Sequence, residues 1–315
     1  MIGIVGAGAF GTALAIAQNR ETMLWVRDPA MAAQIATTRV NPRLPDNRLP
    51  ENVSLTADLT DLAQAKAVLL AIPMQALAGF MAQHAAVLPA VPLVACCKGI
   101  DLATLRGPTA ILLAARPDLA AAILTGPSFA ADIARGLPTA LTLACATVEG
   151  EALQHLLSTP QLRIYRSTDV IGAELGGALK NVIAIAAGIV IGAGLGSSAR
   201  AALLTRGYAE MQRLALTMGA RHETLAGLSG LGDLVLTCTS LQSRNLRFGI
   251  ALGAGTDFDR SITVEGVATA QAVARLARNQ QIAMPITQMV ADLIDRTVTL
   301  DQAIRSLMSR PLKQE

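Results

Sequence analysis

The sequence begins with MIGIVGAGAFGTALAIA, residues 1–17, and this stretch decides the fold of the N-terminal half. Residues 2–5 form an apolar strand pattern, Gly6, Gly8 and Gly11 fit G-x-G-x-x-G, and residues 12–17 have the composition of a helix. A strand, a glycine turn and a helix in this order predict a dinucleotide-binding loop. The first glycine permits the tight turn, the second lets the backbone approach a pyrophosphate, and the helix N-terminus attracts the phosphate charge.

Outward from this loop, short apolar runs alternate with helical patterns, as in a doubly wound α/β sheet. We expect further strands at residues 22–26, 67–72, 92–96 and 121–125, with a proline- and arginine-rich loop at 38–52. Beyond about residue 168 helical periodicity takes over, at residues 172–192, 199–218, 263–279, 285–295 and 300–309. Expected helix caps include Ser167 or Thr168 and Thr299. The sequence predicts a Rossmann-type domain over residues 1–166 and an all-helical domain over 167–315.

Length and composition narrow the class of protein. A chain of 315 residues is long enough for about two domains. The net charge is +3 and no run of like charges occurs, which argues against a nucleic-acid-binding face or a polybasic membrane anchor. The four cysteines show no C-x-x-C spacing, so we expect neither a disulfide framework nor a structural zinc site.

One stretch raises the question of a membrane span. Residues 181–199 contain no charged side chain, and the mean hydropathy of the chain is +0.46. The stretch is long enough to span a bilayer, but it is mostly alanine and glycine with few large aliphatic residues. We interpret it as a buried helix of a cytoplasmic protein, and no basic segment precedes the first strand as a secretory signal would require.

The end of the second expected strand should select the cofactor ribose. It contains Arg27 followed by Asp28 and Pro29. An acidic residue here binds the 2′-hydroxyl of NAD, whereas an arginine accommodates the 2′-phosphate of NADP. Arg27 comes first and Asp28 is placed to cap the next helix, so the sequence favours NADP and leaves NAD as the alternative.

Lysine is rare in a chain that otherwise uses arginine, with 4 lysines against 22 arginines. Lys98 follows an expected strand, at the edge where a doubly wound sheet binds ligands. Lys180 lies at the front of the least polar expected helix. Burial can lower the pKa of a lysine ammonium and let it exchange a proton, so both are candidates for acid–base catalysis. The alternative is that each lysine merely covers apolar surface. The three histidines lie away from glycine loops and strand ends.

A third polar cluster follows a glycine-rich turn. Asp233 begins an apolar stretch, and Thr237 lies one helical turn later on the same face. Ser243, Arg244 and Asn245 then place a planar bidentate donor beside two neutral hydrogen-bonding side chains, a combination suited to a phosphate. A solvated loop with an ordinary arginine is the alternative.

Taken together, these blocks resemble the bacterial NAD(P)-dependent glycerol-3-phosphate dehydrogenases over nearly the whole chain. The motifs are the glycine loop, NPRLP at 41–45, CKG at 97–99, GPSFA at 126–130, GALKNVIA at 177–184, GLGDLVLTCT at 230–239, SRN at 243–245 and VEG at 264–266. The resemblance implies reversible hydride transfer between NAD(P)H and dihydroxyacetone phosphate, giving sn-glycerol 3-phosphate for glycerophospholipid biosynthesis. It also implies a homodimer and no metal.

The resemblance assigns roles to individual residues. Lys180 becomes the proton-transfer residue, with Lys98, Asp233 and Thr237 in the same pocket. The implied substrate-binding residues are Lys98, Gly126, Ser128, Lys180, Asn181, Asp233, Ser243, Arg244 and Asn245. The implied cofactor-binding residues are Gly6, Gly8, Ala9, Phe10, Gly11, Arg27, Lys98, Ala130, Arg244, Thr263 and Glu265. Ala9 departs from the hydroxyl residue frequent in the family, where a backbone contact can serve instead.

Two other functions compete with this interpretation. A lysine-dependent β-hydroxyacid dehydrogenase would share the two-domain plan but would need an anchor for a carboxylate rather than a phosphate. A non-catalytic NAD(P)-sensing protein would bind the cofactor but would need neither lysine.

Overall fold

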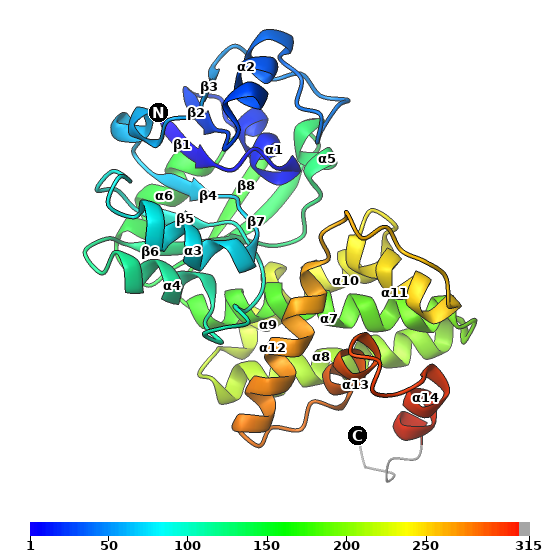
Figure 1. Cartoon of the computed structure of the whole chain (residues 1–315). Helices are drawn as coiled ribbons and strands as arrows, with labels where there is room; N and C mark the ends of the chain where they lie inside the picture. The colour runs from blue at the N-terminus through cyan, green and yellow to red at the C-terminus, as the bar shows by residue number, and fades with distance from the viewer. Residues whose placement is uncertain (309–315) are drawn as a thin grey trace.

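The N-terminal lobe of the computed structural model, which describes residues 1–308, is built on one eight-stranded sheet (Figure 1). The strand order is β3-β2-β1-β4-β5-β6-β7-β8. The strands are β1 (Ile2–Val5), β2 (Thr22–Trp25), β3 (Val53–Thr56), β4 (Val68–Leu70), β5 (Leu93–Ala95), β6 (Ala121–Thr125), β7 (Thr139–Cys145) and β8 (Leu162–Ser167). The predicted doubly wound sheet is confirmed, because the chain starts at a central strand and winds outward in both directions.

Three strands, β3, β7 and β8, were not expected from the sequence. All neighbouring strands pair in parallel except β6 and β7, which are antiparallel. Strand β3 lies at one edge of the sheet and β8 at the other. In β8, Leu162 and Ile164 are buried while Arg163 and Tyr165 face solvent, so this strand lacks the continuous apolar run of a central parallel strand.

Helices cover both faces of the sheet. They are α1 (Ala9–Ala17), α2 (Pro29–Thr38), the 3-10 helix η1 (Leu59–Gln64), α3 (Met74–His84), α4 (Pro108–Ala115), α5 (Ala130–Ala134) and α6 (Glu149–Leu157). Alternate residues of β1 enter different cores: Ile4 packs with Leu14 of α1, whereas Val5 packs with Leu77 of α3. The carboxyl ends of the strands therefore remain the open edge where a ligand can bind.

The second lobe is helical. Its elements are α7 (Val170–Gly192), α8 (Gly196–Thr217), α9 (His222–Ala226), the π-helical turn η2 (Leu228–Gly232), α10 (Asp233–Thr239), α11 (Arg244–Ala254), α12 (Glu265–Asn279), α13 (Pro285–Ile294) and α14 (Leu300–Met308). Thr299 caps α14, as predicted, by accepting a bond from the Gln302 N–H at 3.3 Å. Residue 309, where we expected this helix to end, lies outside the described residues.

Helix α7 runs through the middle of the helical lobe (Figure 1). It is long and apolar enough to cross a membrane, but 89% of its apolar window is buried inside the protein. This confirms the expected buried helix. The charge-free run at 181–199 is not one helix, because α7 ends at Gly192 and α8 begins at Gly196. Small residues allow α11 to lie close to α7: a Cβ on Gly249 would collide with the Ile185 carbonyl.

The start of α7 differs from the prediction. Its cap is Asp169, whose Oδ1 accepts a bond from the Gly172 N–H at 2.8 Å, so the assignment of Ser167 or Thr168 as the cap is wrong. The other carboxylate oxygen accepts a bond from the Arg221 N–H at 2.7 Å. Asp169 thus caps α7 with one carboxylate oxygen and holds the segment before α9 with the other.

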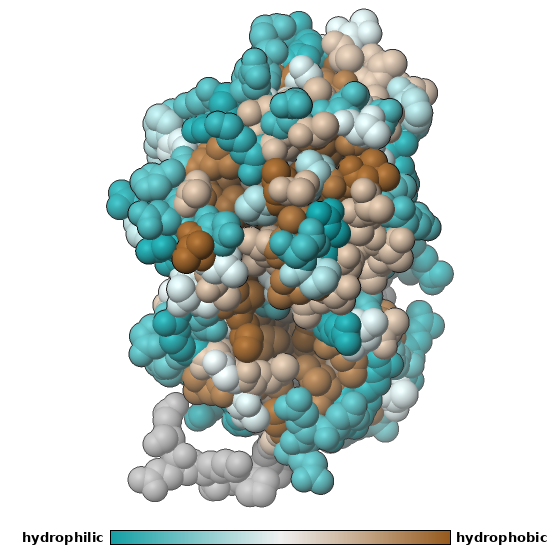
Figure 2. Space-filling model, turned by 90° about the vertical axis from the view of Figure 1, so that its left-hand side faces the viewer, coloured by the Kyte–Doolittle hydropathy of each residue, from teal (hydrophilic) through white to brown (hydrophobic). Residues whose placement is uncertain are grey.

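The surface is mixed in character. On the face in Figure 2, hydrophilic residues cover much of the rim, while apolar residues gather toward the middle. Several large apolar side chains of the helical lobe are exposed, among them Ile191, Leu195, Leu216, Val235 and Leu241.

Candidate active site

The glycine loop between β1 and α1 has room for a ligand. Gly6 has a φ of +107°, and a Cβ there would lie 2.6 Å from the Ala71 carbonyl oxygen. A Cβ on Gly8 would meet no atom within 4 Å, and no side chain caps the first turn of α1. Uncapped N–H groups at a helix N-terminus attract an anion. The loop therefore fits the pyrophosphate of a dinucleotide.

At the end of β2, Asp28 and Arg27 have different tasks. The Asp28 side chain accepts a bond from the Ala30 N–H at 3.0 Å and caps α2, as predicted. Arg27 is exposed beside it. A carboxylate engaged in capping is less free to bind a ribose hydroxyl, so the exposed cation is the group at this position that fits an additional phosphate.

Two lysines from different lobes share one buried carboxylate. Lys98, which follows β5, donates from Nζ to Asp233 Oδ2 at 2.5 Å and to the Gly126 carbonyl at 2.9 Å. Lys180 of α7 donates from Nζ to Asp233 Oδ1 at 2.9 Å and to Thr237 Oγ1 at 2.6 Å. Asp233 is 1% exposed. The structure thus brings Lys98, Lys180, Asp233 and Thr237 into one cluster between the sheet and the helical lobe.

The position of the carboxylate follows from the local chain path. The π-helical turn η2 precedes α10, and Asp233 is the first residue of that helix. Thr237 lies one turn later and donates from Oγ1 to Asp233 Oδ1 at 3.2 Å. Because residues four apart face the same side of a helix, both side chains point toward Lys180. Extra backbone in a π turn is frequent at functional sites.

The electrostatics of the cluster favour proton exchange. Burial lowers the pKa of Lys180 to about 8; the Asp233 carboxylate opposes this shift, and the Lys98 ammonium adds to it. Burial alone would raise the pKa of Asp233, but the two ammonium groups hold it below its usual value. The carboxylate therefore stays ionised, while Lys180 can gain or lose a proton near neutral pH.

This pKa predicts opposite pH dependences for the two directions of a carbonyl–alcohol interconversion. With Lys180 as the predicted proton-transfer residue, reduction would need its protonated form, whose fraction falls as the pH rises through about 8. Oxidation needs the neutral form, whose fraction rises over the same range. We expect kcat/KM for reduction to decline above pH 8 and kcat/KM for oxidation to increase. Steady-state rates between about pH 7 and about pH 9 test this, and flat profiles in both directions would contradict it.

The start of α11 presents a second set of polar groups. Asn245 Nδ2 donates to Asn181 Oδ1 at 2.9 Å, and its Oδ1 accepts a bond from the Gly266 N–H at 2.9 Å. The Ser243 hydroxyl caps α11 by accepting a bond from the Leu246 N–H at 3.1 Å. Arg244 is exposed between these two buried residues. The geometry leaves the guanidinium as the group most available to an anion.

The remaining predicted residues have more peripheral places. Gly126 has a φ of +136°, and the Ser128 hydroxyl donates to its carbonyl at 3.3 Å. Phe10 and Ala130 pack against the same small apolar cluster. Burial raises the pKa of Glu265, and the nearby Arg244 and a hydrogen bond with the Met74 backbone oppose this rise. Thr263 is exposed, and among residues 1–308 no hydrogen bond joins it to the charged cluster. Their ligand contacts stay predictions.

Two contacts between α7 and the N-terminal lobe were not expected from the sequence. Thr125 is fully buried, its hydroxyl has no hydrogen-bond partner, and a Cβ on Gly177 would lie 2.6 Å from it. Its position at the end of β6, directly before Gly126, was the available signal. Glu174 of α7 accepts a bond from the Thr109 N–H at 2.7 Å and so caps α4 in the other lobe. Nothing local in the sequence indicates such a contact.

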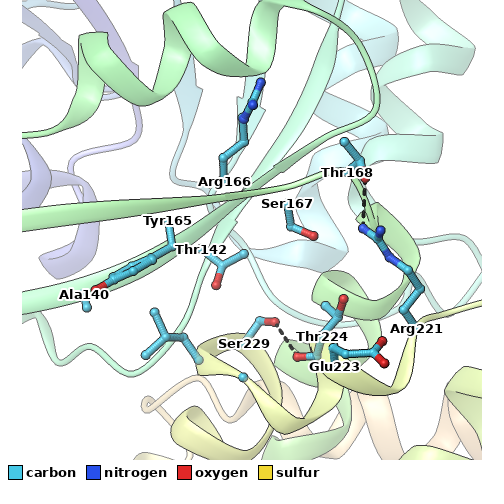
Figure 3. A pocket seen from close by; sticks show the side chains of 12 residues that line it. Ala140, Thr142, Tyr165, Arg166, Ser167, Thr168, Arg221, Glu223, Thr224 and Ser229 are labelled. Carbon is cyan, nitrogen blue, oxygen red and sulfur yellow. Dashed lines mark hydrogen bonds between the residues drawn. The ribbon is translucent and has the colours of Figure 1, made fainter.

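A hollow of about 820 Å³ opens elsewhere, between strands β7 and β8 on one side and α9 and η2 on the other (Figure 3). None of the predicted site residues lines it. Two of its hydroxyl groups are already engaged: the Thr168 hydroxyl accepts a bond from Arg221, and the Ser229 hydroxyl donates to the Thr224 carbonyl. This hollow is a crevice between the lobes, separate from the lysine cluster.

We also searched the described residues for side chains that could ligate a metal ion. Within residues 1–308, no group of three or more histidine, cysteine, aspartate or glutamate side chains is placed to hold a metal ion. All four cysteines are buried and unbridged.

Comparisons with known proteins point to one family. Residues 1–150 match the family model described as "NAD-dependent glycerol-3-phosphate dehydrogenase N-terminus", and residues 169–305 match the model of its C-terminus. The chain is 66% identical to a glycerol-3-phosphate dehydrogenase [NAD(P)+] of Cereibacter sphaeroides, covering 100% of both chains. It is 58% identical to one of Paracoccus denitrificans, covering 100% of this chain and 99% of that one. The crystal structure of glycerol-3-phosphate dehydrogenase from Coxiella burnetii superimposes with a TM-score of 0.93 at 36% identity, covering 98% of each chain.

Proposed function

The chain belongs to the NAD-dependent glycerol-3-phosphate dehydrogenase family, and we propose that the lysine cluster is the catalytic centre of this activity. The enzyme interconverts dihydroxyacetone phosphate and glycerol 3-phosphate with NAD(P)H or NAD(P)+. The observation that carries the assignment of the centre is the buried Lys180 ammonium, held by Asp233 and Thr237, with its pKa lowered to about 8.

In this proposal Lys180 is the general acid for reduction and the general base for oxidation. A bound NAD(P)H would supply the hydride to the ketone carbon, and negative charge would then grow on the ketone oxygen. The Lys180 ammonium stabilises this charge and gives up its proton to the oxygen, while Lys98 adds positive potential at the same place. Asp233 orients both ammonium groups through its two oxygens. In the reverse direction, neutral Lys180 takes the proton from the alcohol.

Arg244 and Asn245 would hold the substrate phosphate, with Asn181 fixing the Asn245 amide at 2.9 Å. Gly126, Ser128 and Ser243 would complete the substrate side. A phosphate held at a fixed distance from the reacting carbon turns remote binding energy into orientation.

Replacing Arg244 by alanine tests this anchor. We expect KM for dihydroxyacetone phosphate to rise by about 10- to 100-fold, because a hydrogen bond with a charged partner contributes about 1.5–3 kcal/mol. At saturating cofactor, kcat/KM for unphosphorylated dihydroxyacetone should change little, because that substrate has no phosphate for Arg244 to bind. The matched control is Arg247→Ala, an exposed arginine one turn further along the same helix. Equal effects of the two variants on KM would remove Arg244 from the phosphate site.

On the cofactor side, the enzyme would use Gly6, Gly8, Ala9, Phe10 and Gly11 around the phosphates. The other proposed contacts are Arg27, Lys98, Ala130, Arg244, Thr263 and Glu265. The exposed Arg27 beside a capping Asp28 supports a preference for NADP.

Arg27→Ala should weaken the binding of NADPH but not that of NADH. KM for NADPH should rise by about 10-fold, because the variant lacks the charge that pairs with the 2′-phosphate, while KM for NADH stays within about twofold. Arg20→Ala is the control, since Arg20 is an exposed arginine at the other end of β2. The predicted preference for NADPH is wrong if the wild-type enzyme has the lower KM for NADH and Arg27→Ala changes KM for both cofactors by the same factor.

Family membership decides against the two competing functions, a β-hydroxyacid dehydrogenase and a non-catalytic sensor.

We further propose a domain division between residues 166 and 167, a cytoplasmic location and a role in glycerophospholipid biosynthesis. Exposed apolar side chains on the helical lobe support a homodimer. Light scattering should then give twice the chain mass of 32.6 kDa. Absence of nucleic-acid binding remains a prediction from the low net charge.

A further inference from the structure

The NPRLP motif at residues 41–45 has no role in the mechanism above, yet its first residue contacts the glycine loop. Asn41 is 2% exposed and lies in the loop between α2 and β3. Its Nδ2 donates to the Ala7 carbonyl at 3.0 Å and to Thr12 Oγ1 at 2.7 Å. Its Oδ1 accepts a bond from the Arg43 N–H at 2.9 Å. A buried amide with these bonds is a brace between two segments.

The chemistry of the partners fixes the orientation of this amide. The Ala7 carbonyl can only accept a hydrogen bond, and the Arg43 N–H can only donate one. The NH₂ end of Asn41 must therefore face Ala7, and its oxygen must face Arg43.

The bond to Ala7 also determines the direction of the next N–H group. The Ala7 carbonyl and the Gly8 N–H belong to one planar trans peptide, so they point in opposite directions. With the carbonyl held by Asn41, the Gly8 N–H points away from the brace. Among the described residues no group accepts a bond from this N–H. The same turn carries the uncapped start of α1 and the open space at Gly8.

The loop that carries Asn41 is itself well anchored. The Arg39 guanidinium donates to the carbonyls of Pro50 and Val53, and the Leu49 N–H donates to the Arg39 carbonyl at 2.8 Å. Leu44 is buried in the cluster with Ala13 of α1. Asn41 is thus held from both sides and can transmit this rigidity to the glycine loop.

We propose that Asn41 is a positioning residue for the dinucleotide: it locks the Ala7–Gly8 peptide so that the Gly8 N–H is presented to the cofactor pyrophosphate. The inference rests on the proposed cofactor site in the glycine loop. A preset N–H lowers the cost of ordering the loop when the cofactor binds. Since NAD and NADP share the pyrophosphate, the effect must be equal for both, unlike that of Arg27.

The test measures Kd for NADPH and for NADH by nucleotide fluorescence, with no turnover required. We expect Asn41→Ala to raise both Kd values by about 10-fold, as for the loss of two hydrogen bonds. Asn41→Asp keeps the side-chain volume and the bond from Arg43, but it turns a carboxylate oxygen toward the Ala7 carbonyl. We expect an increase at least as large for this variant, and it serves if Asn41→Ala does not fold.

Asn52→Ala is the matched control. Asn52 Nδ2 donates to the carbonyls of Gln18 at 3.0 Å and Arg20 at 2.7 Å, so it braces two carbonyls at the other end of α1. It should lower the melting temperature to a similar extent without changing either Kd. For Asn41→Ala, kcat at saturating NADPH and KM for dihydroxyacetone phosphate should stay near wild type.

Three results would overturn the proposal: unchanged Kd values in both Asn41 variants, an equal rise in Asn52→Ala, or a rise for only one of the two nucleotides. Because nucleotide binding is measured without substrate, these outcomes differ from a failure of the lysine cluster or of the phosphate anchor. Those failures would leave the Kd values of the Asn41 series as expected.

Discussion

Lys180→Ala lowers kcat for the reduction of dihydroxyacetone phosphate by about a thousandfold or more in this account. The variant lacks both the proton donor and the positive charge beside the ketone oxygen, and general acid catalysis contributes about 10²- to 10⁴-fold by itself. Kd for NADPH should remain near the wild-type value, because Lys180 contacts Asp233 and Thr237 rather than the glycine loop.

The fold should tolerate this change. In Lys180→Ala, Asp233 keeps its 2.5 Å ion pair with Lys98, so no uncompensated charge is left in the interior. Lys180→Arg keeps a cation but not a group that exchanges protons near neutral pH, so it should not restore kcat. Lys66→Ala, at an exposed lysine, is the control. A Lys180→Ala enzyme that keeps more than a few per cent of kcat would show that another group transfers the proton.

Asp233→Ala has the second large effect, and here stability falls together with activity. The substitution leaves two ammonium groups near each other in a buried site without a counter-charge. Removing one partner of a buried ion pair costs about 3–5 kcal/mol in the free energy of unfolding. Chemical denaturation should show this loss, whereas Asp118→Ala, which removes an exposed ion pair with Arg116, should leave the midpoint almost unchanged.

Asp233→Asn separates electrostatics from packing. The amide keeps the side-chain volume, but it removes the carboxylate that raises the pKa of Lys180. The pKa of Lys180 should fall further below 8, so the decline in the reduction rate should begin at a lower pH than in the wild type. An unchanged pH profile in this variant would mean that Asp233 does not set the charge state of Lys180.

Much of the sheet could be predicted because its signals are local. The strand β1, the glycine turn and α1 are adjacent in sequence, and the central strands β4 and β5 are continuous apolar runs. The edge strand β8 could not be identified in this way, since its outward residues are polar or exposed and its partner β7 is antiparallel to β6. Strand order at this edge depends on pairing between segments distant in sequence.

The candidate site shows the same division. The scarcity of lysine and the position of Lys98 after a strand were readable from the chain itself. Only the resemblance to a known family placed Lys98, Lys180 and Asp233 in one pocket. Local pattern could not do so, because Lys98 and Asp233 are 135 residues apart and meet only when the two lobes pack. The cap of α7 was misassigned because Asp169 also accepts a bond from the Arg221 N–H. That bond joins segments distant in sequence, so no local pattern indicates it.

Mixing purified protein with dihydroxyacetone phosphate and following the absorbance of NADPH, with NADH in parallel, measures the dehydrogenase activity most directly. We predict rapid oxidation of the reduced nucleotide with this substrate, slow oxidation with unphosphorylated dihydroxyacetone, and loss of the signal in Lys180→Ala. Protein that binds NADPH but oxidises it no faster with dihydroxyacetone phosphate than without it would contradict the account.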